Sequence, residues 1–308
     1  MARRLAAVSV DLDAIHHYFA IHGLAPSGDA LDRAYDRALE RMGAWAEARR
    51  IPLTLFAVGE DLEREGAARI VAALARRGHA VENHSYSHRY DLTRLDAATM
   101  RREIEAGSQA IERVTGRRPV GFRAPGYTVN DTLFDVLDEA GVLFDSSVFP
   151  CPAYYFAKAA AMGGMRARGR ESRSVLDTPR VLTAPRSPYR PGARWSDPVG
   201  KSRRFVELPV QVTRGARLPF IGTLLGLVGA RGAAALARAC VGEALVNLEL
   251  HAIDFLDASE GLQALAPYQP ELRVPLAQRM AALDAALDVL AGGGHAFVRL
   301  DDAARVFA

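Results

Sequence analysis

Apolar and polar positions along the chain follow two alternating periods. Short apolar runs, typical of buried strands, fall at residues 5–12, 52–58, 79–82, 120–123, 142–145, 205–212, 245–251 and 295–300. Between them, apolar residues at every third or fourth position predict helices at residues 29–49, 61–77, 96–115, 131–140, 157–165, 224–241 and 276–290. This alternation predicts an α/β fold with a parallel sheet and outer helices, either open or closed into a barrel. In both versions a functional site lies at the carboxyl ends of the strands.

The regular alternation stops between about residues 150 and 204, where Pro, Gly, Arg and Ser accumulate. An irregular stretch of this length inside a compact domain is usually functional or disordered. We therefore expect one domain over residues 1–308 that carries an irregular insertion at about 150–204. The aromatic residues Tyr154, Tyr155 and Phe156 within it either line a binding cleft or cover the rim of the barrel.

The amino-acid composition limits the classes of binding partner that the protein is expected to have. The 39 basic and 36 acidic residues nearly cancel, which argues against nucleic acid as the main partner. Cys151 and Cys240 lie far apart without metal-ligand spacing, so we expect two reduced, buried thiols. Carbohydrate fits the aromatic cluster better, and a homo-oligomer is compatible with the sequence.

Two apolar runs resemble an export signal or a membrane-spanning segment, but both are too short for that role. The first run ends early at Asp11, and the run at 218–230 is interrupted by Arg231, short of the roughly 20 residues that a spanning helix needs. We favour a buried barrel helix over an interfacial segment for the second run. The sequence therefore predicts no integral membrane segment and a cytoplasmic protein.

Two carboxylates mark the end of the first strand. Residues two apart on a strand point to the same side, so Asp11 and Asp13 present their carboxylates to one face. A loop or helix cap is the ordinary alternative for Asp13. A functional site is indicated only if other reactive side chains lie at the ends of neighbouring strands.

Two histidines four residues apart come after the third predicted strand. If residues 84–88 form one helical turn, His84 and His88 share a face. Two imidazoles and a carboxylate make a three-ligand site that leaves room for water, as in catalytic zinc sites. Taken alone, a pair of histidines with this spacing is a surface coincidence about as often as it is part of a metal site.

Two further strand ends carry reactive side chains. Arg123 at the end of a strand could hold a carboxylate through paired hydrogen bonds, and Gly126 lets a backbone amide approach an oxyanion. The alternative is an ordinary strand exit with a surface arginine. In the strand at 245–251, Asn247, Glu249 and His251 alternate with aliphatic residues, and a terminal histidine suits a general acid.

Together these pieces resemble the polysaccharide deacetylase family, also called the NodB homology domain or carbohydrate esterase family 4. The resemblance covers residues 6–251 and includes four motifs: Ser-Val-Asp-Leu-Asp at 9–13, His-Ser-Tyr-Ser-His at 84–88, Arg-Ala-Pro-Gly at 123–126 and Leu-Glu-Leu-His at 248–251. The Asp-x-Asp opening is similar to that of an intracellular-looking branch of the family. The resemblance implies a distorted (β/α)7 barrel and metal-dependent removal of an N-acyl group, most often acetate from an amino sugar.

The resemblance also implies roles for individual residues. A divalent metal, with zinc as the expected ion, would be bound by three side chains: Asp13, His84 and His88. Asp11 would be the base that activates the attacking water, and Arg123 would orient Asp11. The backbone amide of Gly126 would help stabilise the oxyanion, and His251 would protonate the departing nitrogen.

The chain departs from the family pattern in two places. The usual first motif has adjacent aspartates, whereas Leu12 separates Asp11 from Asp13 here. The Asp-Trp motif that usually tunes the catalytic histidine is not evident, so Asp145 and Asp254 are the candidates for that role. His16 and His17 are not expected to be ligands.

The sequence therefore predicts a metal-dependent hydrolase that removes an N-acetyl group from an amino sugar. The sugar would belong to a poly- or oligosaccharide or to its lipid- or nucleotide-linked precursor. One alternative keeps the site but acts on a small molecule, as an amidohydrolase on a cyclic imide or ureide or as a deformylase. The other alternative is a non-catalytic carbohydrate-binding barrel.

Overall fold

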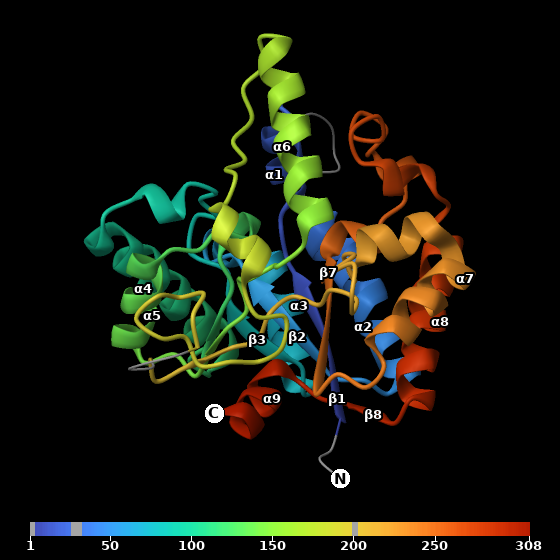
Figure 1. Ribbon diagram of the computed structural model, residues 1–308. Helices are drawn as coiled ribbons and strands as arrows, with labels where there is room; N and C mark the ends of the chain where they lie inside the picture. The colour runs from blue at the N-terminus through green and yellow to red at the C-terminus, as the bar shows by residue number, and fades with distance from the viewer. Residues whose placement is uncertain (1–3, 26–32, 199–202) are drawn as a thin grey trace.

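The computed structural model describes residues 4–25, 33–198 and 203–308 and shows a curled parallel sheet with helices around it (Figure 1). The strands are β1 (Arg4–Asp11), β2 (Leu53–Ala57), β3 (Ala80–Asn83), β4 (Gly121–Phe122), β5 (Phe144–Asp145), β6 (Val206–Glu207), β7 (Leu245–His251) and β8 (His295–Phe297). Their order is β6-β5-β4-β3-β2-β1-β7, and β8 pairs with the start of β1. The pairings between these strands are parallel, as predicted.

Helices connect the strands on the outside of the sheet. They are α1 (Ile15–Ile21), α2 (Leu39–Arg49), α3 (Glu65–Arg76), α4 (Ala97–Thr115), α5 (Asp131–Ala140), α6 (Pro152–Ala167), α7 (Gly222–Cys240), α8 (Leu276–Gly292) and α9 (Leu300–Phe307). A π-helical turn at Ala34–Ala38 precedes α2, and the first residues of the helix predicted at 29–49 lie outside the described part of the chain. The sequence patterns predicted neither α1 nor α9, and α6 is longer than the expected 157–165.

The strand predicted at 205–212 is wrong beyond Glu207, and the reason explains how the sheet closes. Pro209 has no N–H to continue a ladder, and the segment after β6 turns toward β7. The Leu208 amide still donates to β5, at Asp145 O (2.8 Å), whereas the Gln211 amide donates to the Asn247 carbonyl of β7 (3.0 Å). This crossing segment joins the two edges of the sheet and gives a distorted barrel.

The core explains why β1 reads as a continuous apolar run. Residues 5–10 of β1 are at most 3% exposed, because parallel strands in this kind of fold are covered on both faces. Gly121 of β4 faces the Phe144 ring, and a Cβ there would lie 2.1 Å from a ring atom, so the close approach requires glycine. Cys151 and Cys240 are free and buried, as predicted.

One described helix, α7, is long and apolar enough to cross a membrane by length and composition, with a mean hydropathy of 1.2. Length and composition alone are weak evidence for a span, because a mostly buried core helix passes the same test. Leu225, Ala233 and Ala237 of α7 share a core cluster with Leu283 and Leu287 of α8. Only 28% of the apolar window of α7 is buried, so the helix packs on the barrel along one face and is not the buried helix that the sequence predicted.

A buried carboxyl group supports the β3–β4 edge. Glu82 is 2% exposed and accepts hydrogen bonds from the backbone amides of Val120 (2.7 Å) and Gly121 (2.6 Å). Burial raises the pKa of Glu82 to about 7 despite these bonds. The folded state therefore binds a proton more tightly than the unfolded chain, in which a glutamate has a pKa of about 4.3.

This difference predicts a pH-dependent loss of stability. The contribution of Glu82 is fully present below its unfolded pKa and is lost as the pH rises through about 7. Replacing Glu82 with Gln keeps an acceptor for both amides, so the variant should gain stability relative to wild type between pH 5 and pH 8, by up to about 3 kcal/mol. Urea denaturation at several pH values measures this, with Glu65→Gln on exposed α3 as the control. A Glu82→Gln difference that stays constant across this range would contradict the prediction.

Candidate metal site and active site

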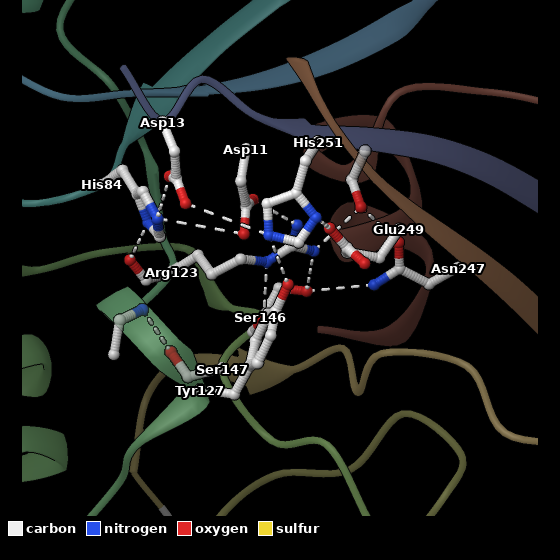
Figure 2. Close-up of polar contacts among 12 residues, drawn as sticks. Asp11, Asp13, His84, Arg123, Tyr127, Ser146, Ser147, Asn247, Glu249 and His251 are labelled. Atoms are coloured by element: carbon white, nitrogen blue, oxygen red, sulfur yellow. Dashed lines mark hydrogen bonds and ion pairs between the residues drawn. The ribbon is translucent and has the colours of Figure 1, made fainter. Parts of the chain in front are cut away.

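Polar side chains from four strand ends meet at one end of the barrel (Figure 2). Asp11 ends β1 and is paired in register with His251, which ends β7. Asp13 lies just beyond β1, His84 follows β3 and Arg123 follows β4. The carboxyl ends of parallel strands share one edge, so the predicted convergence is present in the structure.

Asp13, His84 and His88 form a compact group. Asp13 Oδ1 lies 3.3 Å from His84 Nε2 and 3.0 Å from His88 Nε2, and the three side chains are at most 8% exposed. One potential ligand atom from each lies within 4.8 Å of the others. The second nitrogen of His84, Nδ1, is 2.7 Å from the Arg123 carbonyl, which turns Nε2 toward Asp13.

These three residues fit a divalent cation. The contact between His88 Nε2 and Asp13 Oδ1 lacks hydrogen-bond geometry, and both atoms are buried without a hydrogen-bond partner among the described residues. Such atoms cost stability unless a ligand satisfies them. Burial acts to raise the pKa of Asp13, but His88 and His84 hold it well below its usual range. An ionised carboxylate with two imidazoles matches the donor set of a catalytic metal site with open positions.

The histidine segment is not a helical turn, so that expectation is wrong. Residues 84–88 form a bend in which Ser85 (φ 64°) and His88 (φ 50°) adopt left-handed backbone conformations. The Ser85 hydroxyl accepts a hydrogen bond from the His88 amide (3.1 Å), and Glu103 of α4 binds Ser87 (2.9 Å). Left-handed non-glycine residues are costly and tend to occur at functional sites, where surrounding contacts hold them.

Arg123 is fully buried, so the surface-arginine alternative is wrong. Its Nη1 lies 2.7 Å from Asp11 Oδ1, and its guanidinium carbon sits 4.1 Å from the centre of the Phe56 ring. Nε donates to the Ser146 carbonyl (2.9 Å), and Nη2 donates to the hydroxyls of Ser146 (2.8 Å) and Ser9 (2.9 Å). With its donors engaged on several sides, Arg123 fixes one oxygen of Asp11 in place.

The acidic partner of His251 is Glu249, which the sequence patterns did not single out for that role. Glu249 Oε1 lies 2.9 Å from His251 Nδ1 (Figure 2). Asp145 instead binds Ser147, and Asp254 accepts only the His251 backbone amide (2.9 Å), so both expected candidates are wrong. The signal was available, because Glu249 and His251 are two apart on one strand and share a face.

This neighbour changes the acidity of the imidazole. Burial acts to lower the pKa of His251, but the charge and contact of Glu249, with the charges of Asp13 and Asp11, raise it well above its usual value. Since Glu249 occupies Nδ1, the other nitrogen, Nε2, faces the Asp13 side, 3.9 Å from Asp13 Oδ2. The ion-pair contact with Glu249 therefore orients the ring and favours its protonated form.

Tyr127 is a second side chain at the site that the sequence did not reveal. Its hydroxyl lies 3.3 Å from His251 Nε2. Gly126 (φ 67°) and Tyr127 (φ 59°) are consecutive left-handed residues, and this sharp turn aims the ring inward. A Cβ on Gly126 would lie 2.9 Å from the Tyr90 ring, so glycine is required on both counts.

The insertion at 150–204 holds this turn from outside the barrel. Lys158 of α6 donates to the Gly126 carbonyl (3.0 Å), and Asp177 accepts from the Val129 amide (3.3 Å). Burial lowers the pKa of Lys158 to about 8 and raises that of Asp177 to about 7. The insertion therefore fixes both ends of the segment that presents Gly126.

The aromatic cluster in the insertion divides between two environments. The Tyr154 ring packs edge-on against Tyr127, 5.9 Å away, and thus covers the rim of the site. Phe156 is 61% exposed, so it neither lines a binding cleft nor covers the rim of the barrel.

A cavity of about 590 Å³ opens beside the group Asp13, His84 and His88, which we call the metal group, and His88 is part of its wall. His16 and His17 line it, and the His17 ring lies against His88 with centroids 4.1 Å apart and the ring planes tilted by 43°. Two groups of described residues could hold a metal ion, Asp13–His84–His88 and Asp11–Glu249–His251, and neither His16 nor His17 belongs to them.

Comparisons with known proteins find one family over part of the chain. Residues 31–144 match the family model "Polysaccharide deacetylase". The "Peptidoglycan deacetylase" of Helicobacter pylori is 28% identical over 152 residues, covering 47% of this chain and 49% of that protein. The "Peptidoglycan deacetylase-like protein FGM2" of Gibberella zeae is 34% identical over 76 residues, covering 25% of this chain and 22% of the relative. The chain thus spans at most about half the length of these curated relatives.

Solved structures share the fold. A "probable Polysaccharide deacetylase" from Pseudomonas aeruginosa superposes with a TM-score of 0.58 at 18% identity, covering 99% of this chain and 90% of that one. "Puue Allantoinase" superposes with a TM-score of 0.59 at 18% identity, over 99% and 90%. These likenesses confirm the predicted barrel of the NodB type. Residues 31–144 thus match the polysaccharide deacetylase family, and the chain as a whole shares the fold of that family's solved structures.

Proposed function

We propose that this protein is a metal-dependent hydrolase that removes an N-acetyl group from an amino sugar. The observation that carries the proposal is the group Asp13, His84 and His88, placed between the Asp11–Arg123 pair and His251. The similarity to a peptidoglycan deacetylase and to a peptidoglycan deacetylase-like protein supports a sugar amide as the substrate.

Asp13, His84 and His88 would hold the metal, for which zinc is the candidate on its preference for nitrogen and oxygen ligands. When bound, such an ion polarises an acyl oxygen and makes water more acidic. The bend at residues 84–88 and the Arg123 carbonyl keep both imidazoles aimed at Asp13.

Asp11 is the proposed base. One carboxylate oxygen is bound by Arg123, whereas Oδ2 points toward the histidine side, 3.8 Å from His84 Nε2. An oxygen in this place can accept the proton of the attacking water. Arg123 keeps the carboxylate in one orientation, which is a positioning role.

His251 is the proposed acid for the departing nitrogen. Glu249 holds Nδ1 and favours the protonated ring, so the proton available for transfer is on Nε2. Tyr127 contacts that same nitrogen from the insertion side. Among the described residues the Gly126 amide has no hydrogen-bond acceptor, so it is available to donate to the oxyanion.

A second candidate function keeps the same residues but changes the substrate. The cavity of about 590 Å³ falls in the usual range of small-molecule pockets, and the allantoinase shares the fold. A cyclic ureide or imide, or a formamide, is therefore the alternative substrate.

Metal binding is the first test. Wild-type protein should bind about one divalent ion per chain, and His84→Ala and His88→Ala should each lose it, because two remaining ligands hold an ion poorly. Elemental analysis of the purified variants measures this. His16→Ala, which alters the cavity wall but no candidate ligand, should keep the ion. Full metal content in both ligand variants would refute the site.

The second test identifies the reaction. Metal-loaded protein should release acetate from at least one member of a panel of acetamido sugars, and Asp11→Asn should lower the rate by about a hundredfold or more. The panel should include cyclic ureides and imides. Turnover of these alone would favour the second candidate, and no release from any sugar would reject the deacetylase. If wild type and Asp11→Asn cannot be distinguished in any of these turnover assays, the result would favour the alternative of a non-catalytic carbohydrate-binding barrel.

The third test concerns Glu249. Since its carboxylate raises the pKa of His251, activity should fall as the pH rises through that pKa, and Glu249→Gln should move this limb to lower pH by about one unit or more. The pH profile of kcat measures the shift. Asp254→Asn is the control, because Asp254 contacts the backbone of His251 rather than its ring. An unmoved limb in Glu249→Gln would remove Glu249 from this role.

A further inference from the structure

The cavity beside the metal group has a basic wall. Three arginines line it, two from the segment after His88 and one from the insertion: Arg89, Arg94 and Arg173. Two acidic residues, Glu60 and Asp91, also line it. A wall assembled from segments far apart in sequence is a feature of the folded site rather than of one local charge run.

The arginines differ in whether their charge is already compensated. Arg89 binds Asp91 through two contacts of 2.9 Å and 2.8 Å, so this pair contributes little net charge. The side chains of Arg94 and Arg173 have no ion-pair or hydrogen-bond partner in the part of the chain that the structure describes. Asp91 also acts electrostatically on Arg94, but three arginines face two acids in this wall, so it has an excess of positive charge.

The position of this excess bears on the substrate. His88 lies in the same cavity wall as the arginines, so a ligand in this cavity contacts the arginines and the edge of the Asp13–His84–His88 group together. Guanidinium groups bind phosphate oxygens through planar, paired hydrogen bonds. Arg94 and Arg173 are exposed, so their guanidinium groups are accessible to such a ligand.

We propose that this cavity binds a phosphate or diphosphate group carried by the substrate. The ligand class is a phosphorylated acetamido sugar, whether a sugar phosphate or a sugar linked through diphosphate to a nucleotide or lipid. Arg94 and Arg173 bind the phosphate oxygens, and the acetamido group then lies at the metal group. The identity of the reacting end rests on the proposed function, whereas binding of the anion does not.

Binding to the zinc-loaded Asp11→Asn protein tests this without turnover. Isothermal titration calorimetry would compare N-acetylglucosamine with its 1-phosphate and with uridine diphosphate N-acetylglucosamine. We expect at least one phosphorylated ligand to bind tenfold or more tightly than the neutral sugar. In that background, Arg94→Gln and Arg173→Gln should each weaken the phosphorylated ligand about fivefold and leave the neutral sugar unchanged. Which phosphorylated ligand binds best distinguishes a monophosphate from a diphosphate source.

Two controls separate this site from other causes. Arg69→Gln, on the exposed face of α3, removes the same charge at a distance and should change nothing. A preference for phosphate that both cavity variants retain would mean that the metal alone binds the anion, and it would overturn the proposal. Equal affinity for the neutral and the phosphorylated sugars would also overturn it. So would an affinity for N-acetylmuramic acid, which carries a carboxylate instead of a phosphate, that equals the affinity for the phosphorylated sugars. If the arginine effect is present but wild type releases no acetate, the deacetylase proposal fails and the anion site stands.

Discussion

The buried ion pair between Arg123 and Asp11 is the constraint on which the rest of the site depends. A fully buried guanidinium is tolerable only when its donors are satisfied, and removing one partner of such a pair costs about 3–5 kcal/mol. Arg123 meets this requirement with Asp11 and Ser9 of β1 and with Ser146 beyond β5. Asn247 of β7 donates to the same Ser146 hydroxyl (3.0 Å). One arginine therefore ties together strands from across the barrel at their carboxyl ends.

This pair also separates the duties of two similar carboxylates. Asp11 is the last residue of β1 and is held by a permanent cation. Asp13 lies beyond the strand, beside His84 and beside His88, whose two ring nitrogens lack hydrogen-bond partners among the described residues. Leu12 between them is fully buried and anchors the chain as it leaves the sheet. The intervening residue thus lets the two acids reach different neighbours while they remain in one site.

Strand periodicity predicted one part of the site, and contacts between distant segments determine the other part. Parallel strands bring their ends together, so the amino-acid sequence is enough to place Asp11, His84, Arg123 and His251 at one edge. The left-handed bend of the histidine segment has no periodic signature, and neither does the crossing segment after β6. Glu249 escaped prediction for a different reason: its alternation with His251 is visible in the sequence, but the expected acidic partner was an aspartate elsewhere in the chain.

The insertion at 150–204 shows why strand periodicity alone could not describe the site. Lys158 and Asp177 hold the segment that presents Gly126, and Arg173, between them in sequence, lines the cavity that reaches His88. Under the proposed function the barrel would supply the groups that act on the acyl amide, and Arg173 would contact another part of the substrate. The insertion therefore contributes to two parts of the site, the support of the turn at Gly126 and the wall of the cavity. Neither contribution has a periodic pattern in the sequence, because both depend on contacts between segments far apart in the chain.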